Sequence, residues 1–313
     1  MKKTVLMAGV AALMSTTAMA ENVGVSMAKF DDNFLTVLRN GIQKYADDNG
    51  IGVQIEDAQN DVAKQLDQIN NFVASGVDAI IVNPVDTSAT QAMTDAASAA
   101  NIPLVYVNRQ PVNLDTLPDN QAFVASNEVD SGTLETKEVC RLLKEAGKTE
   151  ANAYIIMGEL SNQAAVQRTQ DIFDVIGGPD CGVKINIIDK QTSNWNRDEA
   201  QNLMTNWLST GTPFDAVIAN NDESAIGAIQ AMKAAGTDMA AVVVGGVDAT
   251  QDALVAMQAG DLDVTVFQNA AAQGAGSLDA AVKLAKGEAV DQKVWVPFEL
   301  VTPANIDTYL SKN

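Results

Sequence analysis

Short apolar runs alternate with stretches of helical spacing along the chain from residue 23 onward. The runs that read as buried strands lie at residues 23–26, 53–56, 79–82, 104–107, 154–157, 183–188, 216–219 and 242–247. The stretches between them are roughly 12–18 residues long, and their apolar residues recur at the spacing of one helix face. Strands that alternate with helices predict an α/β fold with parallel sheets, whose ligands bind beyond the carboxyl ends of the strands.

The predicted strands are too numerous for one ordinary sheet. A first series ends near residues 123–126, a new helix begins near Asp130, and a second series continues to residues 264–267. A late helix at 272–286 and a strand near 294–300 follow. Two successive sheets and a single barrel of eight βα units both fit the length, and periodicity alone does not separate them.

The first residues have the composition of an export signal. Lys2 and Lys3 form a basic start, residues 5–14 form a short apolar segment, and residues 18–20 (Ala-Met-Ala) form a cleavage site of small residues. The apolar segment is shorter than the roughly 20 residues that span a bilayer. We therefore predict a signal peptide over residues 1–20 and a periplasmic product, without a lipid anchor because no cysteine follows the cleavage site.

Charge and composition exclude several classes of function. Without Lys2 and Lys3, 18 of the 20 basic residues remain against 40 acidic ones, a net charge of −22. Such a surface repels nucleic acid and anionic lipid, so neither is expected as a partner. The chain has no histidine, which removes the commonest general base and metal ligand and makes hydrolase chemistry a weak expectation.

The two cysteines form an even pair. Cys140 and Cys181 are the only cysteines of the chain. In an oxidising compartment such a pair predicts one disulfide, and two free buried thiols are the alternative.

Polar and aromatic residues cluster where the predicted strands end. They are Asp32 and Phe34 after the first strand, Asn108 and Arg109, Trp195, Asn221 and Asp222, and Asp248. Arg168 lies on the helix that follows the strand at 154–157. Carboxylates and amides satisfy hydroxyls that both donate and accept, Arg supplies fixed donors, and flat aromatic rings cover the C–H faces of a sugar. This combination predicts a binding site for a polyhydroxylated ring.

Each of these residues also has a structural alternative. Asp32, Asp222 and Asp248 fit the use of Asp as a helix N-cap after a strand. Trp195 fits a place in the hydrophobic core, and Arg168 fits a pair with a surface acid. No Walker-type or GxGxxG loop precedes a helix, so no nucleotide cofactor is expected. A calcium-like segment at 57–61 lacks the glycine and distal glutamate of a calcium loop, so we expect a capped turn and no metal.

Several motifs resemble those of the periplasmic binding proteins for ribose and for glucose/galactose, the substrate-capturing components of ABC importers. They are Lys29-Phe30-Asp31-Asp32-Asn33-Phe34, Asn83-Pro84-Val85-Asp86, Val107-Asn108-Arg109-Gln110-Pro111, Ala219-Asn220-Asn221-Asp222-Glu223 and Gly246-Val247-Asp248-Ala249. The resemblance covers nearly the whole chain after residue 20. It implies two doubly wound parallel-sheet lobes that close over a ligand and are joined by a three-strand hinge, near residues 126–128, 268–270 and 295–298. The first lobe would comprise residues 21–126 and 270–297, and the second residues 127–269 and 298–313, which would hold both cysteines.

The same resemblance assigns individual contacts. Those expected to touch the ligand are Asp32, Phe34 and Asn108 from the first lobe, Arg168, Trp195, Asn221 and Asp248 from the second, and Gln268 at a crossing. Arg109 follows Asn108 where the ribose proteins have an Asp-Arg pair, so its contact is left open. The glucose/galactose proteins would have histidine and aspartate at Asn162 and Ala164; these groups serve the anomeric end of a sugar, and Asn162 could still serve one hydroxyl.

The loss of anomeric-end groups favours a ring without an anomeric carbon, such as an inositol. A hexopyranose such as glucose, galactose or a 6-deoxy sugar is the close alternative. The expected partners are an ABC permease in the inner membrane and, as a further candidate, a chemoreceptor; the protein is expected to be a monomer. A secreted carbohydrate-active enzyme, with Asp32 and Asp248 as its two carboxyls, is the alternative from another class. A repressor on the same fold is excluded because an export signal stands in place of a DNA-binding segment.

Overall fold

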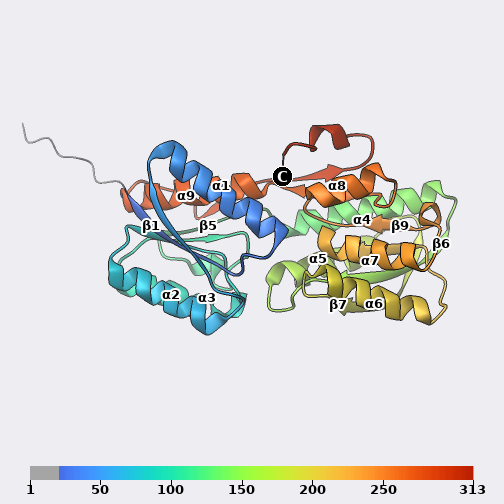
Figure 1. Ribbon diagram of the computed structural model, residues 1–313, viewed down its shortest axis with the longest axis horizontal. Helices are drawn as coiled ribbons and strands as arrows, with labels where there is room; N and C mark the ends of the chain where they lie inside the picture. Colours follow the sequence, from blue (N-terminus) through green and yellow to red (C-terminus); the bar gives the residue numbers. More distant parts are fainter. Residues whose placement is uncertain (1–20, 313) are drawn as a thin grey trace, which may run out of the picture.

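The computed structural model describes residues 21–312, and the predicted export signal at 1–20 lies outside the described residues. Two lobes lie side by side along the long axis of the molecule (Figure 1). The first lobe contains a sheet of six parallel strands in the order β11-β5-β4-β3-β1-β2. Its strands are β1 (Asn22–Met27), β2 (Gly52–Asp57), β3 (Ala79–Val82), β4 (Leu104–Val107), β5 (Gln121–Ala125) and β11 (Lys293–Trp295).

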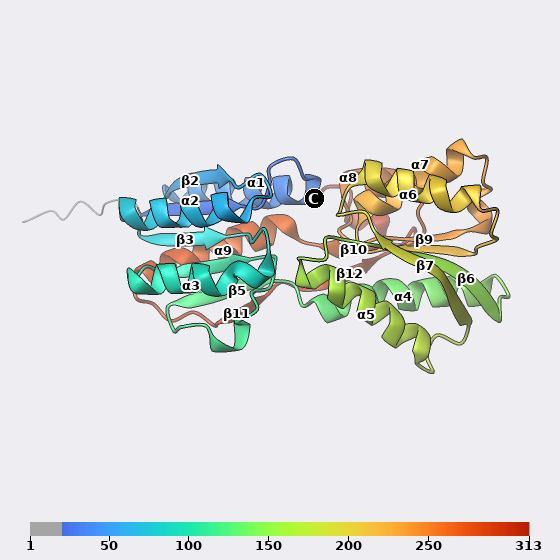
Figure 2. The same ribbon diagram turned by 90° about the horizontal axis from the view of Figure 1, so that it is seen from below.

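Helices cover both faces of this sheet. They are α1 (Asn33–Asn49), α2 (Val62–Ser75), α3 (Thr90–Ala99) and α9 (Ala270–Ala285). Helices α1 and α9 pack against each other on one face, while α2 and α3 lie on the other (Figures 1 and 2). Because both faces are covered, β3 and β4 are buried at every position, which explains why the sequence shows them as continuous apolar runs.

The second lobe repeats this architecture with four parallel strands in the order β7-β6-β8-β9. These strands are β6 (Glu150–Met157), β7 (Lys184–Thr192), β8 (Ala216–Ala219) and β9 (Val243–Gly245), and an antiparallel pair follows, β10 (Thr265–Gln268) with β12 (Phe298–Val301). Its helices are α4 (Glu128–Glu145), α5 (Gln163–Gly177), α6 (Arg197–Ser209), α7 (Asp222–Ala234) and α8 (Gln251–Gln258). Helices α4 and α5 enclose one apolar core, and α6, α7 and α8 enclose another on the opposite face.

The chain passes between the lobes at three places within residues 21–312. They follow β5, β10 and β11, and the last lies between Trp295 and Phe298. The late strand expected near 294–300 is therefore two strands, β11 and β12, in different sheets. The fold class with two α/β lobes and a three-strand hinge is confirmed, and the eight-unit barrel is excluded because the strands form separate open sheets.

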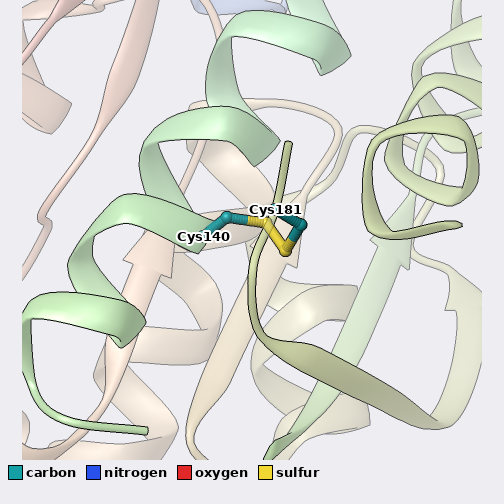
Figure 3. The surroundings of a disulfide bond; sticks show 2 residues. All are labelled: Cys140 and Cys181. Carbon is teal, nitrogen blue, oxygen red and sulfur yellow. A yellow bond between two sulfur atoms is a disulfide. The ribbon is translucent and has the colours of Figure 1, made fainter. Parts of the chain in front are cut away.

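The second lobe carries the disulfide that the cysteine count predicted. Cys140 of α4 and Cys181, in the loop before β7, are joined with a Cα–Cα distance of 5.0 Å (Figure 3). The bridge closes a sequence separation of 41 residues across α5 and fastens the loop before β7 to α4.

The segment at 57–61 is a capped turn. Asp61 is the N-cap of α2 and accepts hydrogen bonds from the backbone of Ala63 and Lys64. In residues 21–312 no cluster of His, Cys, Asp and Glu is arranged to hold a metal ion. The same residues include no helix long and apolar enough to cross a membrane.

Candidate functional site

One cavity between the lobes brings the predicted ligand residues together. All ten residues that the sequence analysis named as ligand contacts line this cavity. They are Asp32, Phe34, Asn108, Arg109, Asn162, Arg168, Trp195, Asn221, Asp248 and Gln268. Leu35, Glu128, Ala164, Glu223 and Thr250 complete its wall and were not predicted as contacts. The cavity lies at the carboxyl ends of both sheets and beside the crossing segments, as expected for an open parallel sheet. We refer to it as the ligand cavity.

Arg168 is held in place by a network of buried partners. It donates from Nε and Nη2 to the two carboxylate oxygens of Glu128, at 2.7 and 3.1 Å. It also donates from Nη1 to the carbonyl of Asn220 at 2.7 Å and from Nη2 to Oε1 of Gln268 at 3.3 Å. The alternative of a surface partner is wrong, because Glu128 and Arg168 are both buried. Fixed by this bidentate pair, Arg168 presents a rigid cationic face to the ligand cavity.

Asp248 is a buried carboxyl aimed at this cation. Its Oδ1 lies 3.9 Å from Nη1 of Arg168. Burial raises the pKa of Asp248 well above its ordinary value, and the nearby Arg168 opposes that shift. Asp248 is not a helix N-cap: Thr250 caps α8, and Asp248 has a positive φ of 123°. Asp248 lines the ligand cavity instead.

Asp222 supports the cavity wall without lining it. Its neighbour Asn221 is the N-cap of α7, so the N-cap alternative for Asp222 is also wrong. Asp222 accepts from the backbone N–H of Thr250 at 2.8 Å and from Oγ1 of Thr265 at 2.7 Å. Burial raises the pKa of Asp222 to about 7. It therefore fixes the turn that carries Asp248 and Thr250.

Trp195 forms an aromatic wall rather than part of the hydrophobic core. Its indole lies on Gly158, where an added Cβ would be 2.1 Å from Cη2 of the ring. The ring centroid is 5.6 Å from the guanidinium carbon of Arg168. Trp195 itself has a positive φ of 62°, and its buried Nε1 has no hydrogen-bond partner among the described residues. Only glycine at 158 allows the ring to lie this close to the backbone.

The first lobe supplies Asp32, Asn108 and Arg109. Asp32 is the N-cap of α1, accepting from the N–H of Leu35 at 2.9 Å, and it also lines the ligand cavity; its contact with a ligand stays a prediction. Asn108 has a positive φ of 67° and donates to Oε1 of Gln273 at 3.3 Å. Arg109 donates to the carbonyl of Pro84 at 3.0 Å, so part of its donor capacity positions the loop after β3.

The two lobes also contact each other directly through polar groups. Glu159 of the second lobe lies 3.6 Å from Nζ of Lys29 and 3.4 Å from Nη1 of Arg109, and it accepts from Nδ2 of Asn60 at 3.3 Å. The backbone N–H and the side-chain hydroxyl of Thr87 both donate to the carbonyl of Ser161, at 3.1 and 3.0 Å. These polar contacts hold the lobes together in a closed arrangement.

The cavity residues that the sequence analysis did not predict are brought to the cavity by tertiary structure. Glu128 is the first residue of α4, immediately after a crossing. Gln268 was predicted as a contact because it lies at a crossing, and the same argument could have identified Glu128. Glu223 belongs to a motif quoted for the resemblance, but nothing in its spacing indicated that it faces the ligand cavity. It accepts from Nδ2 of Asn33 in the first lobe at 2.8 Å.

The chain is similar to known binding proteins over almost its entire length. The periplasmic binding protein domain family matches residues 23–289. A Rhizobium meliloti protein named for the binding of rhizopine is 62% identical over 314 residues, which cover 100% of both chains. An ABC transporter solute binding protein from Bacillus halodurans C-125, solved with bound myo-inositol, shares 40% identity at a TM-score of 0.86 and covers 94% of this chain and 98% of that one.

A second solved structure, the Caulobacter myo-inositol binding protein bound to myo-inositol, shares 27% identity at a TM-score of 0.81. The alignment covers 93% of this chain and 96% of the Caulobacter chain. At this coverage the folds of the Caulobacter and Bacillus proteins match both lobes of this chain. The chain therefore belongs to the periplasmic binding protein family.

Proposed function

We propose that this protein is the periplasmic receptor of an ABC importer and that it captures a cyclitol of the myo-inositol type. The observation that carries the proposal is the composition of the ligand cavity. Two aromatic rings, Phe34 and Trp195, line it together with carboxylates, amides and a fixed guanidinium, from both lobes. Such walls match the apolar faces and the hydroxyl rim of a polyol ring.

The relatives support the same ligand class. The Bacillus and Caulobacter proteins were solved with myo-inositol. Asn162 and Ala164 stand where the glucose/galactose-binding proteins would have a histidine and an aspartate for the anomeric end. Oδ1 of Asn162 accepts from the N–H of Ala164 at 3.1 Å, at the N-terminus of α5. A ring with no anomeric carbon requires fewer groups at that end, which favours a cyclitol over a hexopyranose.

The remaining parts of the proposal concern organisation and partners. Residues 21–126 with 270–297 form the first lobe and residues 127–269 with 298–313 the second, after removal of the signal at 1–20. The closed, ligand-loaded form docks as a monomer on an inner-membrane ABC permease, and a chemoreceptor is a second candidate partner. The relatives are solute-binding proteins and not enzymes, which argues against glycoside hydrolysis by Asp32 and Asp248.

Titration calorimetry with myo-inositol, galactose, glucose and ribose tests the ligand. We expect myo-inositol to bind most tightly; an aldohexose that binds far more tightly would replace the cyclitol and leave the receptor function standing. Asp248→Asn and Trp195→Ala should each weaken binding by about 1–3 kcal/mol, or 5- to 150-fold. Normal folding with wild-type affinity in both variants would place the ligand elsewhere.

A further inference from the structure

One buried carboxyl of the second lobe has no part in the site described above. Glu135 of α4 is 0% exposed, and within residues 21–312 neither of its carboxyl oxygens has a hydrogen-bond partner. A polar group that is buried without a partner destabilises the folded protein, and a charged group does so most strongly. Packing alone therefore does not explain a glutamate at this position.

Glu135 lies against the backbone that leads to Asp248. A Cβ added at Gly245, the last residue of β9, would be 2.7 Å from Oε1 of Glu135. A Cβ added at the next residue, Gly246, would be 2.5 Å from Oδ1 of Asp222. Because successive side-chain positions along a strand point to opposite faces, the two carboxyls enclose this short segment from the α4 side and from the α7 side. Both therefore contact the backbone that positions Asp248.

The charges that face Glu135 do not neutralise it. They are Arg168 of α5, which attracts a carboxylate, and Asp222 of α7, which repels one. The guanidinium of Arg168 already donates to both oxygens of Glu128 and to two neutral groups. Of the strands packed against α4, β8, β9 and β10 carry no charged residue, and Glu299 of β12 pairs with the C-terminal segment. Glu135 thus has no cation of its own.

Glu135 belongs to a buried cluster of interacting carboxyls, whose other members are Glu128, Asp222 and Asp248. Ionisation of every member would leave more negative charge than Arg168 balances, in an interior that water does not hydrate. Glu128 has its bidentate arginine and Asp222 has its hydrogen bonds from the turn, whereas Glu135 has neither. Burial raises the pKa of Glu135 well above its ordinary value, Arg168 opposes the shift, and Asp222 adds to it.

We propose that Glu135 is a positioning residue of the binding site and that it works in its neutral, protonated form. Protonated, it occupies the space against Gly245 without adding charge, and the segment before Asp248 keeps its place. Ionised, it would repel the Asp222 carboxylate across that segment and attract the guanidinium of Arg168. Both effects would reach the ligand cavity, because Asp248 and Arg168 line it. The inference rests on the proposed function only in that a ligand occupies this cavity.

Calorimetry as a function of pH tests the proposal. The probe is myo-inositol or, if it does not bind, whichever of galactose, glucose and ribose does. One proton changes affinity by at most about tenfold per pH unit, and we expect wild-type affinity to fall at least about fivefold between roughly pH 6 and pH 9. Glu135→Gln has the same shape and no charge at any pH. It should match the wild type within about twofold at roughly pH 6 and bind more tightly than the wild type at roughly pH 9.

Asp171→Asn is the matched control. Asp171 is a second buried carboxyl with an unpartnered oxygen, and burial raises its pKa to about 7. It lies against Gly132 at the contact of α4 with α5 and does not line the ligand cavity. Its variant should therefore keep the wild-type dependence of affinity on pH. If it instead behaved as Glu135→Gln does, the affinity would respond to any buried acid near Arg168, and the role assigned to Glu135 would be wrong.

Infrared difference spectra of the ligand-free proteins report the proton directly. The wild type at neutral pH should show a carbonyl stretch of a protonated carboxylic acid that Glu135→Gln lacks. Because this measurement needs no ligand, it separates a failure of the inference from a failure of the proposed ligand. Glu135→Met supplies a second neutral, unbranched side chain if the glutamine variant folds poorly. The proposal is overturned if no such band is lost, if a folded neutral variant keeps the wild-type pH profile, or if it binds about tenfold or more weakly at roughly pH 6.

Discussion

Substitution of Glu159 by Gln should open the protein without changing any residue that lines the ligand cavity. Glu159 does not line that cavity, yet its carboxylate meets Lys29, Arg109 and Asn60 of the other lobe at 3.3–3.6 Å. The side chains of Lys29 and Glu159 are 17% and 8% exposed, so water screens the pair little. When the lobes separate, these groups become hydrated, and the loss of charge then costs nothing. The substitution therefore acts on the closed state alone.

The size of the effect follows from the burial of the contacts. Glutamine retains an acceptor for Asn60 but removes the charge that faces two cations at 3.4 and 3.6 Å, and the loss of such charged contacts at a buried site costs about 1–3 kcal/mol. Under the proposed function the ligand binds the closed state, so we expect that cost to reappear as a 5- to 150-fold loss of affinity. The radius of gyration of the ligand-free variant should exceed that of the wild type.

Calorimetry and solution scattering provide the assay. Glu145→Gln is the matched control, because this glutamate also pairs with an arginine, Arg141, but lies 64% exposed on the outer surface of α4. A double-mutant cycle with Lys29→Met should give a loss smaller than the sum of the single losses, since both changes remove the same pair. Affinity of Glu159→Gln within twofold of wild type, with unchanged scattering, would refute the reasoning.

Three further predictions concern local contacts. Gly158→Ala should displace Trp195 and weaken ligand binding by at least tenfold in calorimetry, whereas Gly177→Ala, which meets no atom within 4 Å, should bind as the wild type does. Reduction of the disulfide should lower the free energy of unfolding by roughly 3–4 kcal/mol, and thermal melts with and without reductant check this; two free thiols in the unreduced, denatured protein would contradict the bridge. Because the pKa of Asp222 is raised to about 7 in the folded state, the folded state binds the proton more firmly than the unfolded one does, and this group's contribution to stability falls as pH rises from about 4 to 7. Denaturant unfolding across that pH range should therefore show a flatter profile for Asp222→Asn, and an unchanged slope would contradict the assignment.

The sequence predicted the strands well where the chain is buried on both faces. The runs at 79–82, 104–107 and 216–219 coincide with β3, β4 and β8, because a strand covered by helices on both sides is apolar at every position. The late segments were harder. No periodicity could show that α9 returns to the first sheet beside α1, or that residues 294–300 divide between two sheets, because both depend on contacts distant in sequence.

The candidate site shows the same limit at single residues. Asp32, Asp222 and Asp248 all follow strands, yet Asp32 caps a helix at the edge of the ligand cavity, Asp222 is an internal support, and Asp248 faces the ligand cavity. Residue type and spacing do not distinguish these uses, since the backbone angle at Asp248 and the burial of Asp222 arise only in the folded chain. Glu128 could have been inferred from its place at a crossing, but its pairing with Arg168, 40 residues away, could not.

The contacts of Arg168 connect the ligand cavity to the hinge. Glu128 and Gln268 flank two of the crossing segments, and both bind the guanidinium that lines the ligand cavity. Loss of the arginine would leave the Glu128 carboxylate buried without its cation, a change that costs about 3–5 kcal/mol in comparable buried pairs. The affinity of an Arg168→Ala variant would thus combine a lost ligand contact with a disturbed hinge. Asp248→Asn keeps the side-chain shape and leaves the Glu128–Arg168 pair intact, and within the network it removes only the longer 3.9 Å contact with Arg168. For this reason the cavity is better mapped through Asp248 and Trp195 than through the residue with the most hydrogen bonds.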